Sequence, residues 1–335
     1  MQRVTIATLA AQLGVSKASV SYALNGQPGV SEQTRERVVA LANELGWHPS
    51  SSARALSRQR ADAIGMVLRR DPTLLGTEPY YMRLLEGVES ALSEAGQSLL
   101  LRMVGTAPGR DAAVYERWAA ERRVDGVIVL DRTAKDPRPA QLTRLGMPFV
   151  LHGVLPADES GVERIENQHR DAELLIGHLA ELGHRRIAHL TGPMHLTHEV
   201  DRTWAIERES TARGMSTVFA EADYTFDTAH ARTAELLAAA ERPTAIVCSN
   251  DVMALAALRA LDEAGLAGEV ALLSWDDSML CQFASPTISA LDRFPDRQGR
   301  RSAQMLLELL DGREFSSAEP SPSELHVRES SRRAQ

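Results

Sequence analysis

The sequence is poor in cysteine and has no long uncharged run. Two cysteines in 335 residues are too few for a scaffold built on disulfides, and free thiols suit a reducing compartment. The longest stretches without Asp, Glu, Lys or Arg are residues 18–31 and 278–291, and both are shorter than the roughly 20 apolar residues of a membrane-spanning helix. The first residues lack the cationic and then apolar order of a secretion signal. We therefore expect a cytoplasmic protein with no membrane partner.

The sequence motifs of common enzyme families are also missing. There is no G-x-S-x-G elbow, no phosphate loop ending in Gly-Lys-Ser/Thr and no G-x-G-x-x-G fingerprint after a strand. His195 and His198 are three residues apart, but no further Cys or His stands beside them to complete a zinc site. We therefore predict no catalytic residue, no metal and no cofactor, which argues against an enzyme.

The charge of the chain is unevenly distributed. The net charge is −8, yet residues 1–60 hold seven basic and three acidic side chains, so this segment is +4 and the remainder is −12. A small basic head on a large acidic body favours a head that meets a polyanion such as DNA. A solvated charged surface without a partner is the alternative that charge alone leaves open.

Residues 4–45 carry the pattern of three short helices. Thr5–Gln12 has apolar residues at helical spacing, Ser16 can cap a second helix that runs to Asn25, and a third runs from Ser31 to Gly46. Two helices joined by a short glycine-containing turn and braced by a third are typical of a helix-turn-helix, whose second helix enters the major groove. A small helical bundle with no DNA role is the alternative.

The second of these helices carries side chains suited to DNA. A lysine can donate to guanine acceptors, an alanine can contact a thymine methyl, and a tyrosine can donate or accept. Small hydroxyl groups suit phosphate oxygens. We predict base contacts from Lys17, Ala18 and Tyr22, and phosphate contacts from Ser16, Ser19 and Ser21.

From Ala63 onward, short apolar runs alternate with amphipathic helical stretches. This alternation predicts parallel sheets covered by helices on both faces. The run is too long for one small doubly wound sheet, so two subdomains or one barrel remain open. The predicted strands are Ile64–Leu68, Ser98–Met103, Gly126–Leu130, Phe149–Leu151, Arg186–Leu190, Thr217–Ala220, Ala245–Cys248 and Val270–Ser274.

Specific segments resemble a known family. The head segment VTIATLAAQLGVSKASVSYALNGQPGVSEQTRERVVALANELGWHPSSSARALS resembles the DNA-binding head and hinge of the lac-repressor/galactose-repressor family. The segments RRVDGVIVL, HLAELGHRRIAHLTGP, PTAIVCSNDVMALAALRALDEAG and LLSWDDS resemble the body of that family and follow its order. The resemblance implies an α/β fold with an all-α helix-turn-helix head and a periplasmic-binding-protein-like body of two Rossmann-like subdomains.

The same resemblance implies the domain boundaries. We expect a helix-turn-helix domain, a hinge, and a body that binds an effector and forms dimers. The body is expected to divide into an N-subdomain and a C-subdomain. The expected ranges are 1–48 for the head, 49–61 for the hinge and 62–335 for the body, with the N-subdomain about 62–160 plus 292–325 and the C-subdomain about 161–291.

In this family a dimer reads a palindromic operator, and paired hinge helices insert leucines into the minor groove. Leu56 falls on that hinge leucine, with Ala53 and Arg54 beside it. An apolar wedge of this kind partly unstacks a base step and kinks the duplex. Many members carry arginine where Tyr22 stands, so the resemblance leaves the preferred operator base at that position open. A core contact is the alternative role for Leu56.

The resemblance also implies an effector site in the cleft between the subdomains. Aromatic faces combined with Arg, Asn and Asp suit a polyhydroxylated ligand, so a sugar is the expected effector. Val154 replaces an arginine that many sugar-responsive members carry after His152 and Gly153. The alternatives are structural, with Asp276 as a cap, Trp275 in the core and Arg202 paired with a neighbouring acid. The predicted effector contacts are Tyr80, Tyr81, His152, Arg202, Tyr224, Asn250, Trp275 and Asp276.

These observations predict a sequence-specific transcriptional repressor that binds a palindromic operator as a homodimer under effector control. The C-terminal segment has no leucine heptads, so no tetramer is expected. A two-lobed sugar-binding protein without a DNA role is the alternative.

Overall fold

The computed structural model describes residues 4–24, 26–47, 60–70, 76, 78–107, 109–153, 162–313 and 322–331; in the helix that begins at Val162, side chains are described from Gln168 onward. The chain divides into two compact units, Met1–Ala61 and Asp62–Gln335. We call the first unit the head and the second the body. Within the described residues, every helix is too short or too polar to cross a bilayer.

The head is a bundle of three helices around a small apolar core. The helices are α1 (Ile6–Leu13), α2 (Lys17–Leu24) and α3 (Glu32–Glu44), close to the three that the sequence predicts. Thr5 and Ser31 cap α1 and α3, because their hydroxyls accept backbone N–H groups that have no partner in the first turn. Leu9, Val20 and Val38 are fully buried in one cluster. This core holds α2 against the two helices that brace it.

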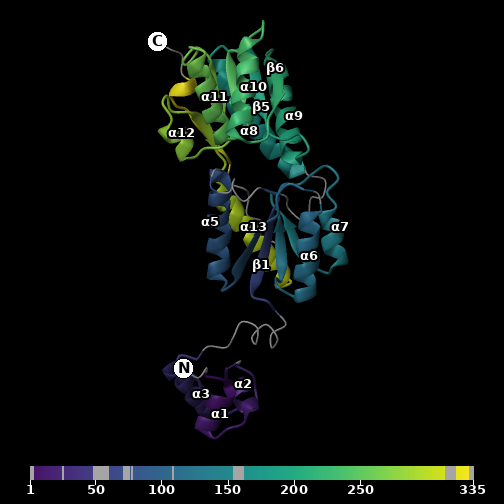
Figure 1. The fold of residues 1–335 in the computed structure, drawn as a ribbon, viewed down its shortest axis with the longest axis vertical. Coiled ribbons are helices and arrows are strands. Elements are labelled where there is room, and N and C mark those ends of the chain that lie inside the picture. The colour runs from purple at the N-terminus through teal and green to yellow at the C-terminus, as the bar shows by residue number, and fades with distance from the viewer. Residues whose placement is uncertain are drawn as a thin grey trace. The chain divides into compact units, whose positions relative to one another are not determined.

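The first lobe of the body is a parallel sheet between two layers of helices (Figure 1). Its strand order is β2-β1-β3-β4. One apolar cluster joins the sheet to α5 and α13, and another joins the opposite face to α6 and α7. The strands are β1 (Ala63–Leu68), β2 (Ser98–Met103), β3 (Gly126–Val129) and β4 (Phe149–Leu151); the helices are α5 (Pro79–Glu94), α6 (Arg110–Glu121), α7 (Arg138–Arg144) and α13 (Pro295–Leu310).

The second lobe has its own sheet of order β10-β9-β8-β7-β5-β6. Helices α8 and α9 cover one face, and α10, α11 and α12 cover the other. The strands are β5 (Arg186–Thr191), β6 (Ser216–Glu221), β7 (Ala245–Cys248), β8 (Ala271–Ser274), β9 (Ser289–Asp292) and β10 (Glu324–His326). The helices are α8 (Val162–Glu181), α9 (Thr197–Ala212), α10 (Phe226–Ala238), α11 (Asp251–Glu263), α12 (Met279–Phe283) and the short η2 (Glu329–Ser331). Two separate sheets rule out the single barrel.

Each of the eight predicted strands is present, but β9 and β10 were not predicted. β9 is parallel to β8, whereas β10 is antiparallel to β9 at the edge of the second sheet. This pairing corrects one expected boundary. Residues 292–325 were assigned to the N-subdomain, and α13 does pack against the first lobe, but Glu324 and Leu325 belong to β10 in the second lobe.

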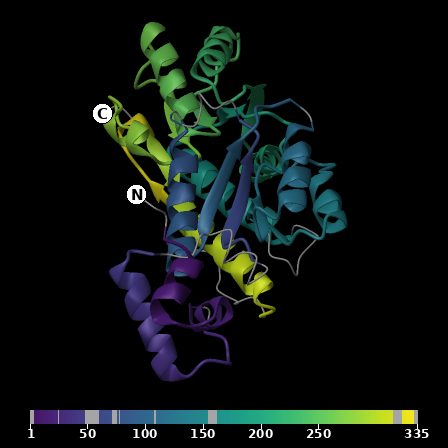
Figure 2. The same cartoon turned by 60° about the horizontal axis from the view of Figure 1, so that its bottom comes forward.

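Helices α5 and α13 lie side by side, as Figure 1 and Figure 2 both show. Their backbones approach closely at two glycines. A β-carbon at Gly87 would stand 1.7 Å from the carbonyl oxygen of Asp296, and one at Gly299 would stand 2.2 Å from that of Leu84. Larger residues at these positions would push the helices apart. The contact fixes the start of α5, which carries two tyrosines predicted to bind effector.

Candidate functional site

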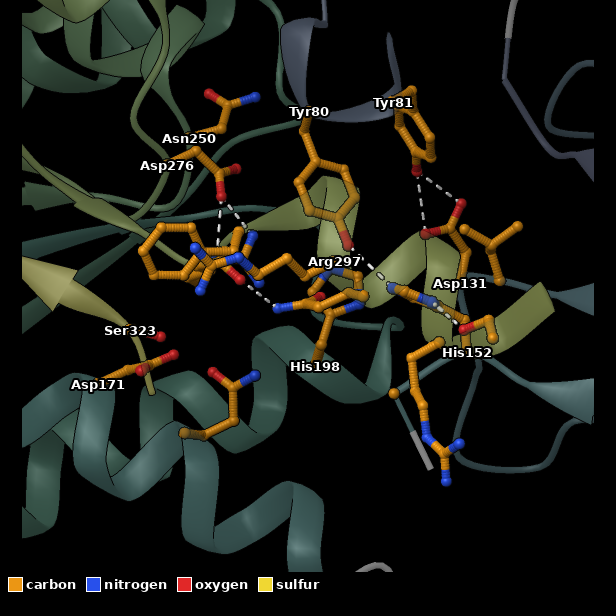
Figure 3. Close-up of a pocket in the computed structure, with 18 of the residues that line it drawn as sticks. Tyr80, Tyr81, Asp131, His152, Asp171, His198, Asn250, Asp276, Arg297 and Ser323 are labelled. Carbon is orange, nitrogen blue, oxygen red and sulfur yellow. Dashed lines mark hydrogen bonds and ion pairs between the residues drawn. The ribbon is translucent and has the colours of Figure 1, made fainter. Parts of the chain in front are cut away.

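A cavity of about 390 Å³ lies where the two lobes meet, and Figure 3 shows part of its lining. It is lined by side chains that follow β1, β3 and β4 of the first lobe and β7, β8 and β9 of the second. The carboxyl ends of parallel strands are where open α/β sheets bind ligands. Seven of the eight predicted effector contacts line it: Tyr80, Tyr81, His152, Arg202, Tyr224, Asn250 and Asp276.

Two tyrosines at the start of α5 form an aromatic wall from the first lobe. The rings of Tyr80 and Tyr81 meet edge to face at 5.5 Å. The Tyr81 hydroxyl donates to both carboxylate oxygens of Asp131, at 3.0 and 2.9 Å. The Tyr80 hydroxyl lies 3.1 Å from Nε2 of His152, whose Nδ1 lies 2.9 Å from the hydroxyl of Ser302 on α13 (Figure 3). These hydrogen bonds hold both rings in place before any ligand arrives.

Arg70 is a half-buried cation between aromatic rings of the two lobes. Its guanidinium lies 5.4 Å from the ring centre of Tyr81 and 5.6 Å from that of Tyr224. It pairs with Asp131 at 3.2 Å and with Glu78 at 3.6 Å. Burial raises the pKa of Glu78 to about 7, because Arg70 compensates only part of the lost hydration. Arg70 therefore connects charged and aromatic groups across the cavity.

In the second lobe, Asp276 and Arg293 form an ion pair in the cavity wall. Nε of Arg293 donates to Asp276 Oδ1 at 3.0 Å, and the guanidinium lies 5.1 Å from the Tyr80 ring centre. Asn250 caps α11, because its Oδ1 accepts the backbone N–H of Met253 at 2.8 Å. This bond leaves the Asn250 amide NH₂ as the group it can offer to a ligand.

Arg202 and Trp275 are more deeply buried than the sequence suggests. Arg202 donates through Nη1 to Glu199 at 2.9 Å and to the carbonyl oxygen of Ser249 at 3.0 Å. Its guanidinium lies 5.0 Å from the centre of the Trp275 ring. Trp275 is 0% exposed and belongs to the apolar core next to α8 and α9, not to the cavity lining. Trp275 is thus the one predicted contact that does not line this cavity; it packs against Arg202, which does.

Tyr224 presents its ring to the cavity from an unusual backbone conformation. Its φ is 67°, in the left-handed region that side-chain-bearing residues seldom adopt. The ring lies against Gly192, where a β-carbon would stand 2.3 Å from it. Its hydroxyl lies 2.8 Å from Glu199 Oε1 and 2.8 Å from His198 Nε2. Packing and hydrogen bonds together hold this strained position.

Several lining residues were not predicted from the sequence, and they include Arg70, Asp131, Asp171, His198 and Arg293. Arg70 and Asp131 each stand two residues after the end of an apolar strand, β1 and β3 respectively. A charged residue that follows a buried parallel strand is a signal that sequence reading could have used. Among the described residues, no group of three or more His, Cys, Asp or Glu side chains is arranged to hold a metal ion.

His189 gives the second lobe a pH dependence that can be tested. The imidazole is 0% exposed and burial lowers its pKa to about 4, a shift that Glu199 opposes and Arg202 assists. The unfolded chain takes up this proton near pH 6.5, so the free energy of unfolding falls as the pH drops from 6.5 toward 4. We expect His189→Gln to remove this loss. The amount by which the free energy of unfolding of the variant lies below that of wild type should therefore decrease by about 3 kcal/mol between pH 7.5 and pH 4.

Urea unfolding of both proteins at several pH values would measure that difference. His230 is matched as a control, because its side chain is partly exposed beside Glu263 on the same lobe. If wild type and His189→Gln differ in free energy of unfolding by the same amount at both ends of the pH range, His189 is not the group that causes the loss of stability at low pH.

In the head, the side chains predicted to read bases lie on the exposed side of α2. Lys17, Ala18 and Tyr22 are exposed, while Val20 and Ala23 on the other side are buried. A helix held this way can present its outer side to a groove without losing its core.

The predicted phosphate contacts have local roles as well. The hydroxyl of Ser16 accepts the backbone N–H of Ser19 at 3.0 Å and so caps α2, and the two hydroxyls lie 2.9 Å apart. Ser21 is half-buried. The hinge predictions, Ala53, Arg54 and Leu56, lie outside the described residues.

A helix-turn-helix unit joined to a two-lobed body with a ligand-sized cavity defines a DNA-binding regulator with a binding-protein-like body. Residues 5–50 match the lacI family of bacterial regulatory proteins, and residues 176–331 match the periplasmic binding protein-like domain. The chain is 33% identical over 322 residues to the HTH-type transcriptional regulator CelR of Thermobifida fusca, with 93% of each chain covered.

Solved structures of similar proteins are regulators as well. The transcriptional regulator CelR in complex with cellobiose aligns with a TM-score of 0.70 and 31% identity over 98% of this chain and 100% of that one. The lac repressor dimer bound to operator and the anti-inducer ONPF aligns with a TM-score of 0.84 and 24% identity over 98% and 99%, which shows a common fold. The chain belongs to the lacI family of bacterial transcriptional regulators, and these relatives are regulators, not enzymes.

Proposed function

We propose that this regulator is a repressor that binds a palindromic operator as a homodimer. Its affinity for the operator falls or rises when a sugar occupies the cavity. The observation that carries the proposal is the cavity itself. It takes polar and aromatic side chains from both lobes, so a ligand there changes the free energy of one lobe arrangement relative to another. A regulator of DNA acts where the chromosome is, so we place this activity in the cytoplasm.

A neutral, hydroxyl-rich effector suits the charges of the cavity. Three arginines near it already have carboxylate partners, in the pairs Arg70–Asp131, Arg202–Glu199 and Arg293–Asp276. An anionic ligand would have to displace a carboxylate that is largely shielded from water, which costs free energy. Hydroxyl groups can instead add hydrogen bonds to paired charges, while tyrosine rings cover the C–H faces of a sugar.

The relative that was solved with cellobiose supports a disaccharide as the first probe. The cavity of about 390 Å³ lies within the range of roughly 300–1,000 Å³ that is usual for small-molecule sites. We propose contacts from Tyr80, Tyr81, Tyr224, Asp276 and His152, with Arg202 and Asn250 supplying further donors.

In the head, we propose that Lys17, Ala18 and Tyr22 read base edges and that Ser16, Ser19 and Ser21 contact phosphate. Leu56, flanked by Ala53 and Arg54, enters the minor groove. Effector and operator change each other's binding affinity by the same factor. In typical cases this factor corresponds to a coupling free energy of about 1–3 kcal/mol.

Selection of binding sites from random duplex DNA at near-physiological salt tests the proposal. We expect an enriched palindrome, and an affinity for it that falls steeply as salt rises, because basic side chains release counterions from phosphates. The selected duplex then serves as the probe for cellobiose, with sucrose as a control of the same size.

The alternative hypothesis is that the chain is a two-lobed sugar-binding protein without a DNA role. It predicts no enrichment at any salt concentration, with or without a mixture of metabolites that would supply a missing corepressor. It also predicts that cellobiose binds equally well in the presence and absence of DNA.

A further inference from the structure

Glu199 on α9 is a fully buried carboxylate behind the cavity wall. It is 0% exposed, and the cavity lining includes its partners Arg202 and Tyr224 but not Glu199 itself. Oε1 accepts from Nη1 of Arg202 at 2.9 Å and from the Tyr224 hydroxyl at 2.8 Å. Oε2 accepts from the backbone N–H of Gly192 at 2.7 Å and from the hydroxyl of Ser249 at 2.6 Å. One side chain therefore holds four donors from four segments of the second lobe.

The four donors need a charged acceptor. Burial alone would raise the pKa of Glu199, but Arg202 together with His198 and His189 outweighs it and holds the pKa at about 2. The side chain is thus ionised across the physiological range and accepts hydrogen bonds at both oxygens.

Of the four donors that Glu199 holds, Tyr224 has the strained backbone conformation. Its backbone is in the left-handed region, with φ at 67°, and the ring packs on Gly192 with no room for a β-carbon between them. Glu199 binds the hydroxyl of Tyr224 and the backbone N–H of Gly192 at once. The carboxylate therefore clamps the ring onto the surface beneath it.

We propose that Glu199 is a positioning residue for the effector site: it presets the Tyr224 ring and the Arg202 guanidinium in the orientation that the ligand meets. The inference rests on the proposed function, because the ligand is taken to be the sugar of that cavity. Preorganisation of this kind raises affinity, since the ligand does not have to order the wall as it binds.

Glu199→Gln is the variant that isolates the role. An amide keeps the size of the side chain but has one accepting oxygen and one donating NH₂. If the NH₂ takes the position of Oε2, it points at the backbone N–H of Gly192, which cannot accept a hydrogen bond. If it takes the position of Oε1, it points at the guanidinium of Arg202, which cannot accept one either. Either orientation leaves a buried donor unpaired and loosens the clamp.

The first readout needs no ligand. The chain has five tyrosines, so ¹⁹F NMR of protein labelled with 3-fluorotyrosine gives few signals, and the one that disappears in Tyr224→Phe is Tyr224. We expect Glu199→Gln to shift and broaden the Tyr224 signal while leaving that of Tyr115, which is buried in the first lobe, in place. Glu199→Asp keeps the charge but withdraws it by about 1.5 Å, so it should move the same signal.

The second readout is calorimetric titration with cellobiose. We expect Glu199→Gln to weaken binding by about 10- to 100-fold, the value of hydrogen bonds to a charged group. Operator affinity without sugar should be unchanged. Asp111→Asn is the matched control, because Asp111 is a buried carboxylate of the first lobe that does not line the cavity. It should alter neither the Tyr224 signal nor the cellobiose affinity.

The outcomes separate the two proposals. If wild type binds no cellobiose, the choice of sugar is wrong, and the NMR comparison still decides the role of Glu199. An unmoved Tyr224 signal in both Glu199 variants overturns the positioning role, even if the sugar affinity falls. A loss of affinity shared by Asp111→Asn also overturns it, because the effect would then be general destabilisation.

Discussion

Arg202→Ala is expected to lower the free energy of unfolding of the body by about 3–5 kcal/mol, because removing one partner of a buried ion pair leaves the other charge uncompensated. The remaining charge is Glu199, which is 0% exposed, and Arg202 is its partner at 2.9 Å. The carbonyl oxygen of Ser249 would lose a donor as well. The same variant should lose its response to cellobiose and retain operator binding at temperatures where the body is folded.

The control for this prediction lies on the same helix. Arg208 is exposed, with its guanidinium 5.5 Å from the ring centre of Trp204, so Arg208→Ala should cost no more than about 1 kcal/mol. Combining Arg202→Ala with Glu199→Gln removes the stranded charge, and the double variant should be more stable than Arg202→Ala alone. Chemical denaturation at pH 7 measures all three. Equal losses for Arg202→Ala and Arg208→Ala would show that the pair contributes little to the fold.

The strands that could be predicted are those whose identity is set locally. β1, β3, β7 and β8 are apolar runs buried on both faces, and such runs predict parallel strands without knowledge of their neighbours. β10 could not be found this way, because it has three residues, Glu324–His326, and two of them are polar. It is a strand only because β9 offers an edge to pair with. That edge exists only after the chain has returned to the second lobe.

Family motifs marked predicted contacts that line the cavity, whereas tertiary structure brings in lining residues that no motif marks. Asn250 and Asp276 stand in segments whose resemblance to the family is specific. Arg293 follows β9, and because that strand was not predicted, nothing marked the residue that follows it. Burial depth has no local sequence signal, and Trp275, a predicted effector contact, is fully buried against Arg202. Glu199 could be expected to pair with Arg202, three residues along α9, but its contacts with Tyr224 and Ser249 come from distant segments and leave no local pattern.

Leu56→Ala is expected to weaken operator binding by about 100-fold while leaving cellobiose affinity unchanged. In the proposed complex, the leucine side chain is a wedge in the minor groove, and the cost of unstacking a base step is recovered by the contacts that the bent duplex allows, at a few kcal/mol per step. Alanine cannot fill the opened step. Leu309→Ala is the matched control, because Leu309 is a partly exposed leucine of α13 in the body. It should leave operator affinity as in wild type.

The salt dependence of binding distinguishes the wedge from a simple loss of phosphate contacts. A leucine neutralises no phosphate, so Leu56→Ala should lower the affinity by the same factor at every salt concentration and leave the slope of log affinity against log salt unchanged. Arg54→Ala, by contrast, should reduce that slope by about one if Arg54 meets a phosphate. Titrations of the selected duplex at several salt concentrations would compare the two. A Leu56→Ala variant whose slope falls with its affinity would mean that the hinge is no longer docked on the backbone. The leucine would then act by ordering the hinge and not by opening the base step.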